Sequence, residues 1–155
     1  MAVESGDGYT HSVGYEYDTL NNLTTLVETI GNTVRSTTYT YDDDNRVATM
    51  TTGNAGRSYT YDLWGRVNQR VTSHSGSPLL TDTITYRAPT DATTTGQIAS
   101  LRTAGGSYDV THSYTYDANG NILTVSDGTN TTSYVYDSQN QLVRENNQAA
   151  NKTWI

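Results

Sequence analysis

The sequence contains no cysteine and no phenylalanine, 2 prolines among 155 residues, and a single lysine, Lys152. Without cysteine, disulfides and thiolate metal sites are excluded. No run of about 18 apolar residues is present that would span a bilayer as a helix. The opening segment MAVESGDGYTHS lacks the basic and apolar stretches of a signal peptide. We therefore expect any export signal to lie outside this segment.

Basic residues are also scarce, with 9 Lys and Arg against 16 Asp and Glu and a net charge of −7. A protein that binds phosphate backbones independently of sequence needs a basic surface, so we expect no nucleic-acid partner. What is abundant is tyrosine, with 13 residues, together with threonine. Branched and flat aromatic side chains both pack well on the pleated surface of a sheet. The composition therefore predicts an all-β protein.

One nine-residue phrase recurs along the chain. Aligned on the second tyrosine, the copies are YEYDTLNNL (15–23), YTYDDDNRV (39–47), YTYDLWGRV (59–67), YTYDANGNI (114–122) and YVYDSQNQL (134–142). A degenerate sixth copy with a longer turn lies in residues 83–98 around Tyr86. The recurrence of one motif along the chain is typical of repeat proteins, whose units stack on one another. We expect one array of about six repeats over residues 1–155, without a separate second domain.

Each copy has the pattern of a β-hairpin. The two tyrosines are separated by one residue, so their side chains lie on the same face of a strand. The Asp that follows can accept hydrogen bonds from backbone amides and so start a turn, and the Gly or Asn three positions later tolerates positive φ. The predicted turn residues are Asp18, Asp42, Asp62, Gly65, Asp117, Gly120 and Asp137, with Asn21, Asn45 and Asn140 in the place of Gly. The predicted structural core is Tyr15, Tyr17, Tyr39, Tyr41, Tyr59, Tyr61, Tyr86, Tyr114, Tyr116, Tyr134 and Tyr136.

The strand after each turn carries apolar residues three positions apart, such as Leu23 and Leu26 or Val47 and Met50. In a regular strand this spacing places them on opposite faces. Two explanations stay open. Either both faces of the sheet are covered, or a β-bulge shifts the register.

The segments YDLWGR, YDANGN and YDSQNQ resemble the YD repeats, also called Rhs repeats, of bacterial Rhs and wall-associated proteins, toxin-complex C proteins and teneurins. The closing stretch NQLVRENNQAANKTWI is similar to repeat arrays of secreted Gram-positive proteins. The resemblance implies a spiralling antiparallel sheet that forms a shell around a C-terminal toxin. Six repeats would then form an arc of that shell.

The resemblance implies a structural function in a secreted or cell-surface bacterial protein, with the rest of the shell and its toxin as partners. Family members that release the toxin carry an Asp-Pro step, which is absent here because neither Pro78 nor Pro89 follows Asp. No cleavage activity is therefore carried over. The chain ends where the pattern would begin another strand, and an unpaired strand invites pairing. We accordingly expect edge-to-edge self-association.

Catalytic, metal and cofactor sites are not predicted. The repeated Asp residues are spaced along the array, whereas a glycosidase needs two carboxyl groups about 5 to 10 Å apart. The segments starting at Asp42 and Asp117 resemble the opening of a calcium loop, but Gly53 and Gly128 stand where its final Glu belongs. His11, His74 and His112 have no partner at metal-ligand spacing.

Carbohydrate binding or adhesion is the alternative function. Tyrosine and tryptophan rings can stack on sugars while Asn, Asp and Gln bind the hydroxyl groups. Tyrosines that recur in every repeat favour a structural role. Trp64, within a turn, is the candidate glycan contact.

Overall fold

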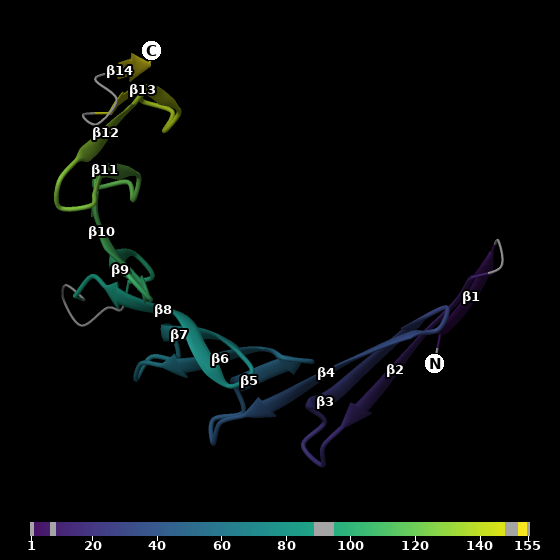
Figure 1. Ribbon diagram of the computed structural model, residues 1–155. Helices are drawn as coiled ribbons and strands as arrows, with labels where there is room; N and C mark the ends of the chain where they lie inside the picture. The colour runs from purple at the N-terminus through teal and green to yellow at the C-terminus, as the bar shows by residue number, and fades with distance from the viewer. Residues whose placement is uncertain (1, 7–8, 89–94, 148–151, 155) are drawn as a thin grey trace. The chain divides into compact units, whose positions relative to one another are not determined.

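The computed structural model describes residues 2–6, 9–88, 95–147 and 152–154, in which every regular element is a β-strand (Figure 1). The strands are β1 Ala2–Gly6, β2 Tyr9–Tyr17, β3 Leu23–Ile30, β4 Thr33–Tyr41, β5 Val47–Thr52, β6 Ala55–Tyr61, β7 Val67–His74, β8 Ser77–Tyr86, β9 Ile98–Gly105, β10 Tyr108–Tyr116, β11 Ile122–Ser126, β12 Thr131–Tyr136, β13 Leu142–Asn147 and β14 Lys152–Trp154. Their order in the sheet is the order of the sequence. The expected all-β fold of tandem antiparallel hairpins is confirmed. Within these ranges no helix has the length and apolar character needed to cross a membrane.

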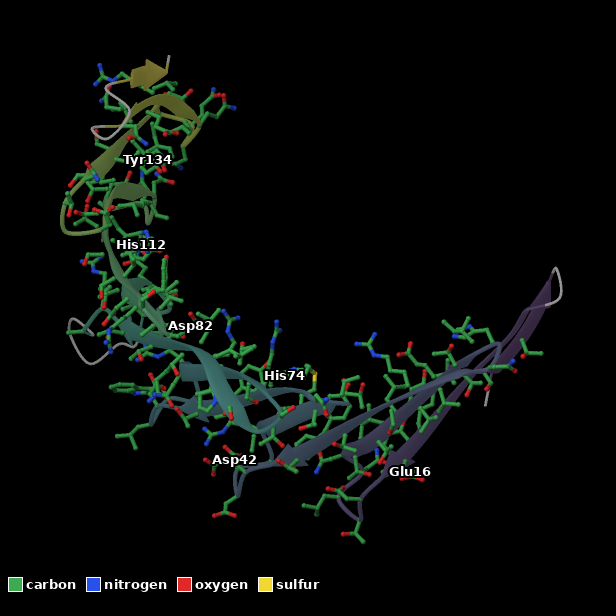
Figure 2. All side chains as sticks on the ribbon, in the orientation of Figure 1. Glu16, Asp42, His74, Asp82, His112 and Tyr134 are labelled. Carbon is green, nitrogen blue, oxygen red and sulfur yellow. The ribbon has the colours of Figure 1, made fainter. Side chains whose placement is uncertain are left out.

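The chain forms two compact units. The first comprises Met1–Thr60 and Arg70–Leu80, and the second comprises Tyr61–Gln69 and Thr81–Ile155. In each unit the described strands form antiparallel hairpins in a single layer, with side chains projecting from the strands (Figure 2). The expectation of one continuous array over residues 1–155 stays a prediction.

A β-bulge occurs at the same place in several of the repeats. In the first hairpin Glu16 pairs with Thr25, but the next residue, Tyr17, pairs with Leu23, so that Thr24 is the extra residue. The same register shift occurs where β4 pairs with β5, β8 with β9, β10 with β11 and β12 with β13. The bulge places Leu23 opposite Tyr17 and Leu26 opposite Tyr15, on the tyrosine-bearing face. Of the two explanations for the three-residue spacing, the structure has the bulge.

Among residues 10–88 and 95–147, no apolar side chain is buried. The only buried side chains in these ranges are Thr37, 7% exposed, and Asp82, 9% exposed. Each is hydrogen-bonded to a threonine of a neighbouring strand: Thr37 Oγ1 lies 2.7 Å from Thr52 Oγ1, and Asp82 Oδ1 accepts from Thr103 Oγ1 at 2.7 Å. A single layer of strands buries each face only as far as neighbouring side chains cover it. The stability of this sheet therefore rests on half-buried rings and on hydrogen bonds.

The predicted tyrosine core differs from the structure in its burial. Tyr15 and Tyr17 are 53% and 57% exposed, because β1 pairs with β2 only as far as Val13 and no described strand flanks them on that side. The other nine predicted core tyrosines are half-buried. A closed core around these rings would need a covering layer that the described residues do not supply.

Candidate functional site

The most regular site in the molecule is the turn that follows the second tyrosine of a repeat. In the first repeat Asp18 Oδ1 accepts hydrogen bonds from the amides of Leu20, at 2.9 Å, and Asn22, at 2.8 Å. The Asp18 amide in turn donates to the Asn22 carbonyl at 2.9 Å. The turns after Asp42, Asp62, Asp117 and Asp137 repeat this pattern. One carboxylate oxygen thus satisfies two amides that the hairpin ladder leaves unpaired.

The residue three positions after each of these aspartates has a positive φ. The values are 67° for Asn21, 64° for Asn45, 78° for Gly65, 90° for Gly120 and 62° for Asn140. Only Gly and, at a small cost, Asn adopt this left-handed conformation routinely. The requirement explains why these two residue types alternate at the position. The structure thus places all the predicted turn residues in turns.

The second carboxylate oxygen commonly binds the side chain four positions after the Asp. Asp18 Oδ2 accepts from Asn22 Nδ2 at 3.0 Å, and Asp62 Oδ2 accepts from Arg66 Nε at 2.7 Å. The Asn22 amide and then its side chain hold the pKa of Asp18 below its usual value. At Asp62, burial opposes ionisation, but the Arg66 side chain and the backbone N–H groups outweigh it and lower the pKa. The pKa values of Asp42 and Asp117 are lowered by N–H groups of Arg46 and Asn121 respectively.

The acidic cluster at Asp42 to Asp44 is engaged with Arg46. Arg46 Nη2 lies 2.8 Å from Asp42 Oδ2 and 2.7 Å from Asp44 Oδ2. A guanidinium in this position neutralises the carboxylates that a calcium ion would need. In the described part of the chain, no three His, Asp or Glu side chains are grouped in a way that could hold a metal ion.

Arg66 joins the turn after Asp62 to the degenerate repeat. Its Nη2 lies 2.6 Å from Asp62 Oδ2, and its Nη1 donates to the carbonyl of Thr95. The guanidinium carbon lies 4.1 Å from the centroid of the Tyr86 ring and 5.0 Å from that of Trp64. Trp64 remains 55% exposed. Part of the expanded turn after Tyr86, residues 89–94, lies outside the described residues.

The hydroxyl group of the second tyrosine connects one repeat to the preceding one. Tyr116 Oη donates to the carbonyl of Ile98 at 2.9 Å. Ile98 lies beyond Ser100, the last residue of β9 that pairs with β10, so its carbonyl has no partner in that ladder. Equivalent bonds run from Tyr41 to Leu23, from Tyr86 to Val67 and from Tyr136 to Ile122, at 2.8, 2.9 and 3.0 Å. The phenol therefore continues the inter-repeat hydrogen bonding where the strands separate.

Asparagine side chains make a second connection between turns. Asn45 Nδ2 donates to Asn22 Oδ1 at 3.0 Å across consecutive repeats of the first unit. In the second unit, Asn140 Oδ1 accepts from Asn121 Nδ2 at 2.8 Å and from Asn119 Nδ2 at 3.0 Å. The turns of adjacent repeats are thus tied by side-chain amides, in addition to the tyrosine bonds.

Sequence reasoning missed both connections between repeats. The recurrence of tyrosine at a position where phenylalanine would pack equally well is the signal for the hydroxyl bond. The recurrence of Asn at the third and fourth positions after Asp is the signal for the amide bond. Both contacts depend on which residues of adjacent repeats lie side by side, and this follows from the strand pairing between repeats, such as that of β3 with β4. The pattern within one repeat does not contain it.

The family model of the RHS repeat matches residues 116–149, which span the turns after Asp117 and Asp137. This match confirms the predicted resemblance to YD-type repeats in this part of the chain. A comparison with curated proteins finds no match. Among solved structures, a chain of the Photorhabdus luminescens Tc holotoxin pore is similar over 89% of this chain, with 14% identity and a TM-score of 0.41. The similar region covers 12% of that chain.

Proposed function

We propose that this chain, which carries the RHS repeat and is built of tandem all-β hairpins, is a structural segment of a bacterial surface or secreted protein. In this proposal it forms part of a wall that holds or displays a C-terminal effector. The observation that carries it is the tyrosine hydroxyl bonded to the carbonyl of the preceding repeat at four places. Such a bond holds adjacent repeats together, as a wall built of stacked repeats requires.

The engagement of the aspartates supports a structural role over catalysis. Catalytic carboxyl groups converge on one bond. Here each turn aspartate binds the amides of its own turn, and Asp42 and Asp62 bind the arginine of that turn as well. We therefore propose that the chain is not an enzyme. The remaining repeats of the parent protein and its effector are the proposed partners, with edge-to-edge pairing of further strands as the mode of association.

Protease protection of the parent protein tests this function. We expect a domain that follows the repeats to be resistant to limited proteolysis in the full-length protein, because the wall excludes the protease. The same domain expressed alone should be digested rapidly under the same conditions. Mass spectrometry of the fragments identifies the sites of cleavage. Equal digestion of the domain in both forms, or the absence of any such domain, would contradict the enclosing role.

Carbohydrate binding at Trp64 is the alternative, and the exposure of its indole ring favours it. The ring lies beside the guanidinium of Arg66, which can donate hydrogen bonds to sugar hydroxyl groups. In a glycan array with the purified chain, this alternative predicts a specific signal that Trp64→Ala removes. The matched control is Leu63→Ala, because Leu63 is the adjacent turn residue and is 98% exposed. No signal on the array would leave the structural function as the conclusion.

A further inference from the structure

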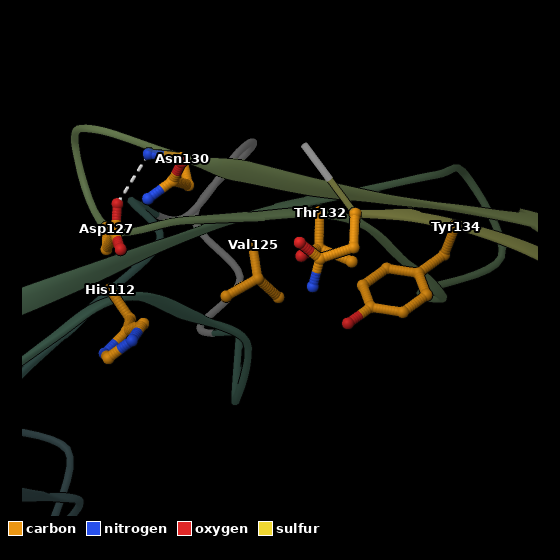
Figure 3. Close-up of a pocket in the computed structure, with 7 residues that line it drawn as sticks. His112, Val125, Asp127, Asn130, Thr132 and Tyr134 are labelled. Atoms are coloured by element: carbon orange, nitrogen blue, oxygen red, sulfur yellow. Dashed lines mark hydrogen bonds between the residues drawn. The ribbon is translucent and has the colours of Figure 1, made fainter. Parts of the chain in front are cut away.

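A polar hollow lies on the tyrosine-bearing face of the second unit. Its floor is a row of paired residues from three strands, Val125 of β11, Thr132 of β12 and Asn147 of β13. His112 of β10 and Tyr134 of β12 form its sides, and Asp127 and Asn130 from the connection between β11 and β12 close one end (Figure 3). The hollow encloses about 200 Å³. His112 and Tyr134 lie on different strands of this unit, as Figure 2 shows.

Three side chains at this hollow have hydrogen-bonding groups that are free to bind a ligand. Within the described ranges, no hydrogen bond is made by the ring nitrogens of His112, the hydroxyl of Thr132 or the hydroxyl of Tyr134, although all three side chains are half-buried. Tyr136, on the same strand and face, instead donates to the Ile122 carbonyl at 3.0 Å. In Figure 3 the hydroxyl end of Tyr134 lies on the side of the ring nearer to Val125 and His112. These unused polar groups belong to side chains that line the same hollow.

The charges around the hollow favour a neutral ligand. Asp127 Oδ1 accepts from the amides of Asn130, at 2.7 Å, and Thr129, at 2.9 Å. These backbone bonds, from Asn130 first, hold the pKa of Asp127 below its usual value, so it is negatively charged at neutral pH. Glu145 pairs with Tyr134 on the neighbouring strand and adds a second acidic group. The two carboxylates disfavour an anionic ligand, an effect partly offset by the His112 imidazole at the same hollow.

The size and lining of the hollow suit a single sugar ring. Pockets for drug-sized ligands enclose about 300 to 1,000 Å³, so this one has room for a smaller molecule. The Tyr134 ring and the Val125 side chain provide an apolar surface. A pyranose has one face of C–H groups that packs on such a surface and a rim of hydroxyl groups that both donate and accept hydrogen bonds.

We propose that this hollow binds one neutral pyranose ring of a glycan. Tyr134 and Val125 contact the apolar face of the sugar, and the Thr132 and Tyr134 hydroxyl groups with the His112 imidazole bind its hydroxyl groups. The site is separate from Trp64. It also does not depend on the structural function, since a wall segment can carry a sugar site or lack one.

Titration of the ¹⁵N-labelled chain with simple sugars tests the site. The probes are the methyl β-pyranosides of glucose, galactose and N-acetylglucosamine, with sodium glucuronate as the anionic comparison. For at least one neutral pyranoside we expect saturable shifts of the amides of residues 112, 125 and 127–134, with roughly millimolar affinity, as befits a shallow site. Glucuronate should bind more weakly.

Two conservative variants locate the binding. Thr132→Val and Tyr134→Phe keep the shape of each side chain and remove one hydroxyl, so each should weaken binding roughly five-fold, the effect of one hydrogen bond. Thr111→Val is the matched control, because Thr111 precedes His112 and lies on the opposite face of β10. Unchanged amide dispersion verifies that the variants are folded.

Three results would overturn the site. The first is the absence of saturable shifts with all three neutral pyranosides. The second is binding that Thr132→Val and Tyr134→Phe leave as tight as in the unmodified chain. The third is binding that Trp64→Ala abolishes while both hollow variants retain it, which would place the sugar at the turn.

Discussion

Replacement of Tyr116 by alanine is expected to lower the free energy of unfolding by about 2 to 3 kcal/mol. The ring is half-buried among neighbouring repeats, and its hydroxyl bonds the Ile98 carbonyl at 2.9 Å. The guanidinium carbon of Arg87 lies 5.7 Å from the ring centroid. The alanine variant loses all three contacts and leaves the carbonyl without its partner. The expected loss is below the roughly 3 to 5 kcal/mol for a fully buried aromatic side chain because part of the ring already faces solvent.

Denaturant unfolding of two matched variants separates the contributions to this loss. Tyr116→Phe keeps the ring and removes the hydroxyl bond, so it should cost about 1 kcal/mol. Tyr108→Ala removes the same side chain from the same strand and face, but at a position that is 51% exposed. It should change the unfolding free energy by less than about 0.5 kcal/mol, as is usual for surface positions. If Tyr116→Ala and Tyr108→Ala cost the same, the second tyrosine does not join the repeats.

Acid is expected to destabilise the fold more than any single substitution in a turn. Asp18, Asp42, Asp62, Asp117 and Asp127 each have a pKa lowered from the ordinary value of 3.8. A carboxyl group with a lower pKa in the folded state binds fewer protons there than in the unfolded chain. Its contribution to stability is therefore complete above pH 3.8 and is lost as the pH falls through the lowered values. Because several turns depend on such a group, their losses accumulate over the same pH range.

Equilibrium unfolding between pH 7 and pH 2 measures this effect, and Asp117→Asn is the informative variant. The amide keeps an oxygen that can accept from the Asn119 and Asn121 backbone N–H groups, but it carries no charge. At neutral pH the variant should be less stable than the unmodified chain. In strong acid, where Asp117 is itself protonated, the difference should disappear. A difference that stays constant down to pH 2 would show that the charge of Asp117 does not contribute.

The turns could be predicted from the sequence because each is a local structure. The carboxylate of Asp18 reaches the amides two and four residues along the chain, and a Gly or Asn three residues after the Asp permits the positive φ that the turn requires, as at Asn21 and Gly65. The three-residue spacing of Leu23 and Leu26 was compatible with the bulge, but it did not distinguish a bulge from a sheet covered on both faces. Local chemistry and periodicity therefore predicted the hairpins.

The burial of the tyrosines and the hollow around His112 could not be predicted, because both depend on contacts between strands far apart in sequence. Tyr15 is exposed because β1 does not extend beside it, and nothing in the residues near Tyr15 indicates this. The hollow brings His112 and Asn147 to one place through three intervening strand pairings. The composition of each segment shows only that these polar residues are present.

The acceptor of the tyrosine bond is a main-chain oxygen, and this has a consequence for how such a chain can change in length. The acceptor is in each case the residue's own main-chain carbonyl, although the side chains differ between Leu23, Val67, Ile98 and Ile122. The tyrosine of an inserted repeat could therefore form this hydrogen bond whatever side chain the preceding repeat carries at that position. Duplication or loss of one unit would require no compensating substitution at this contact.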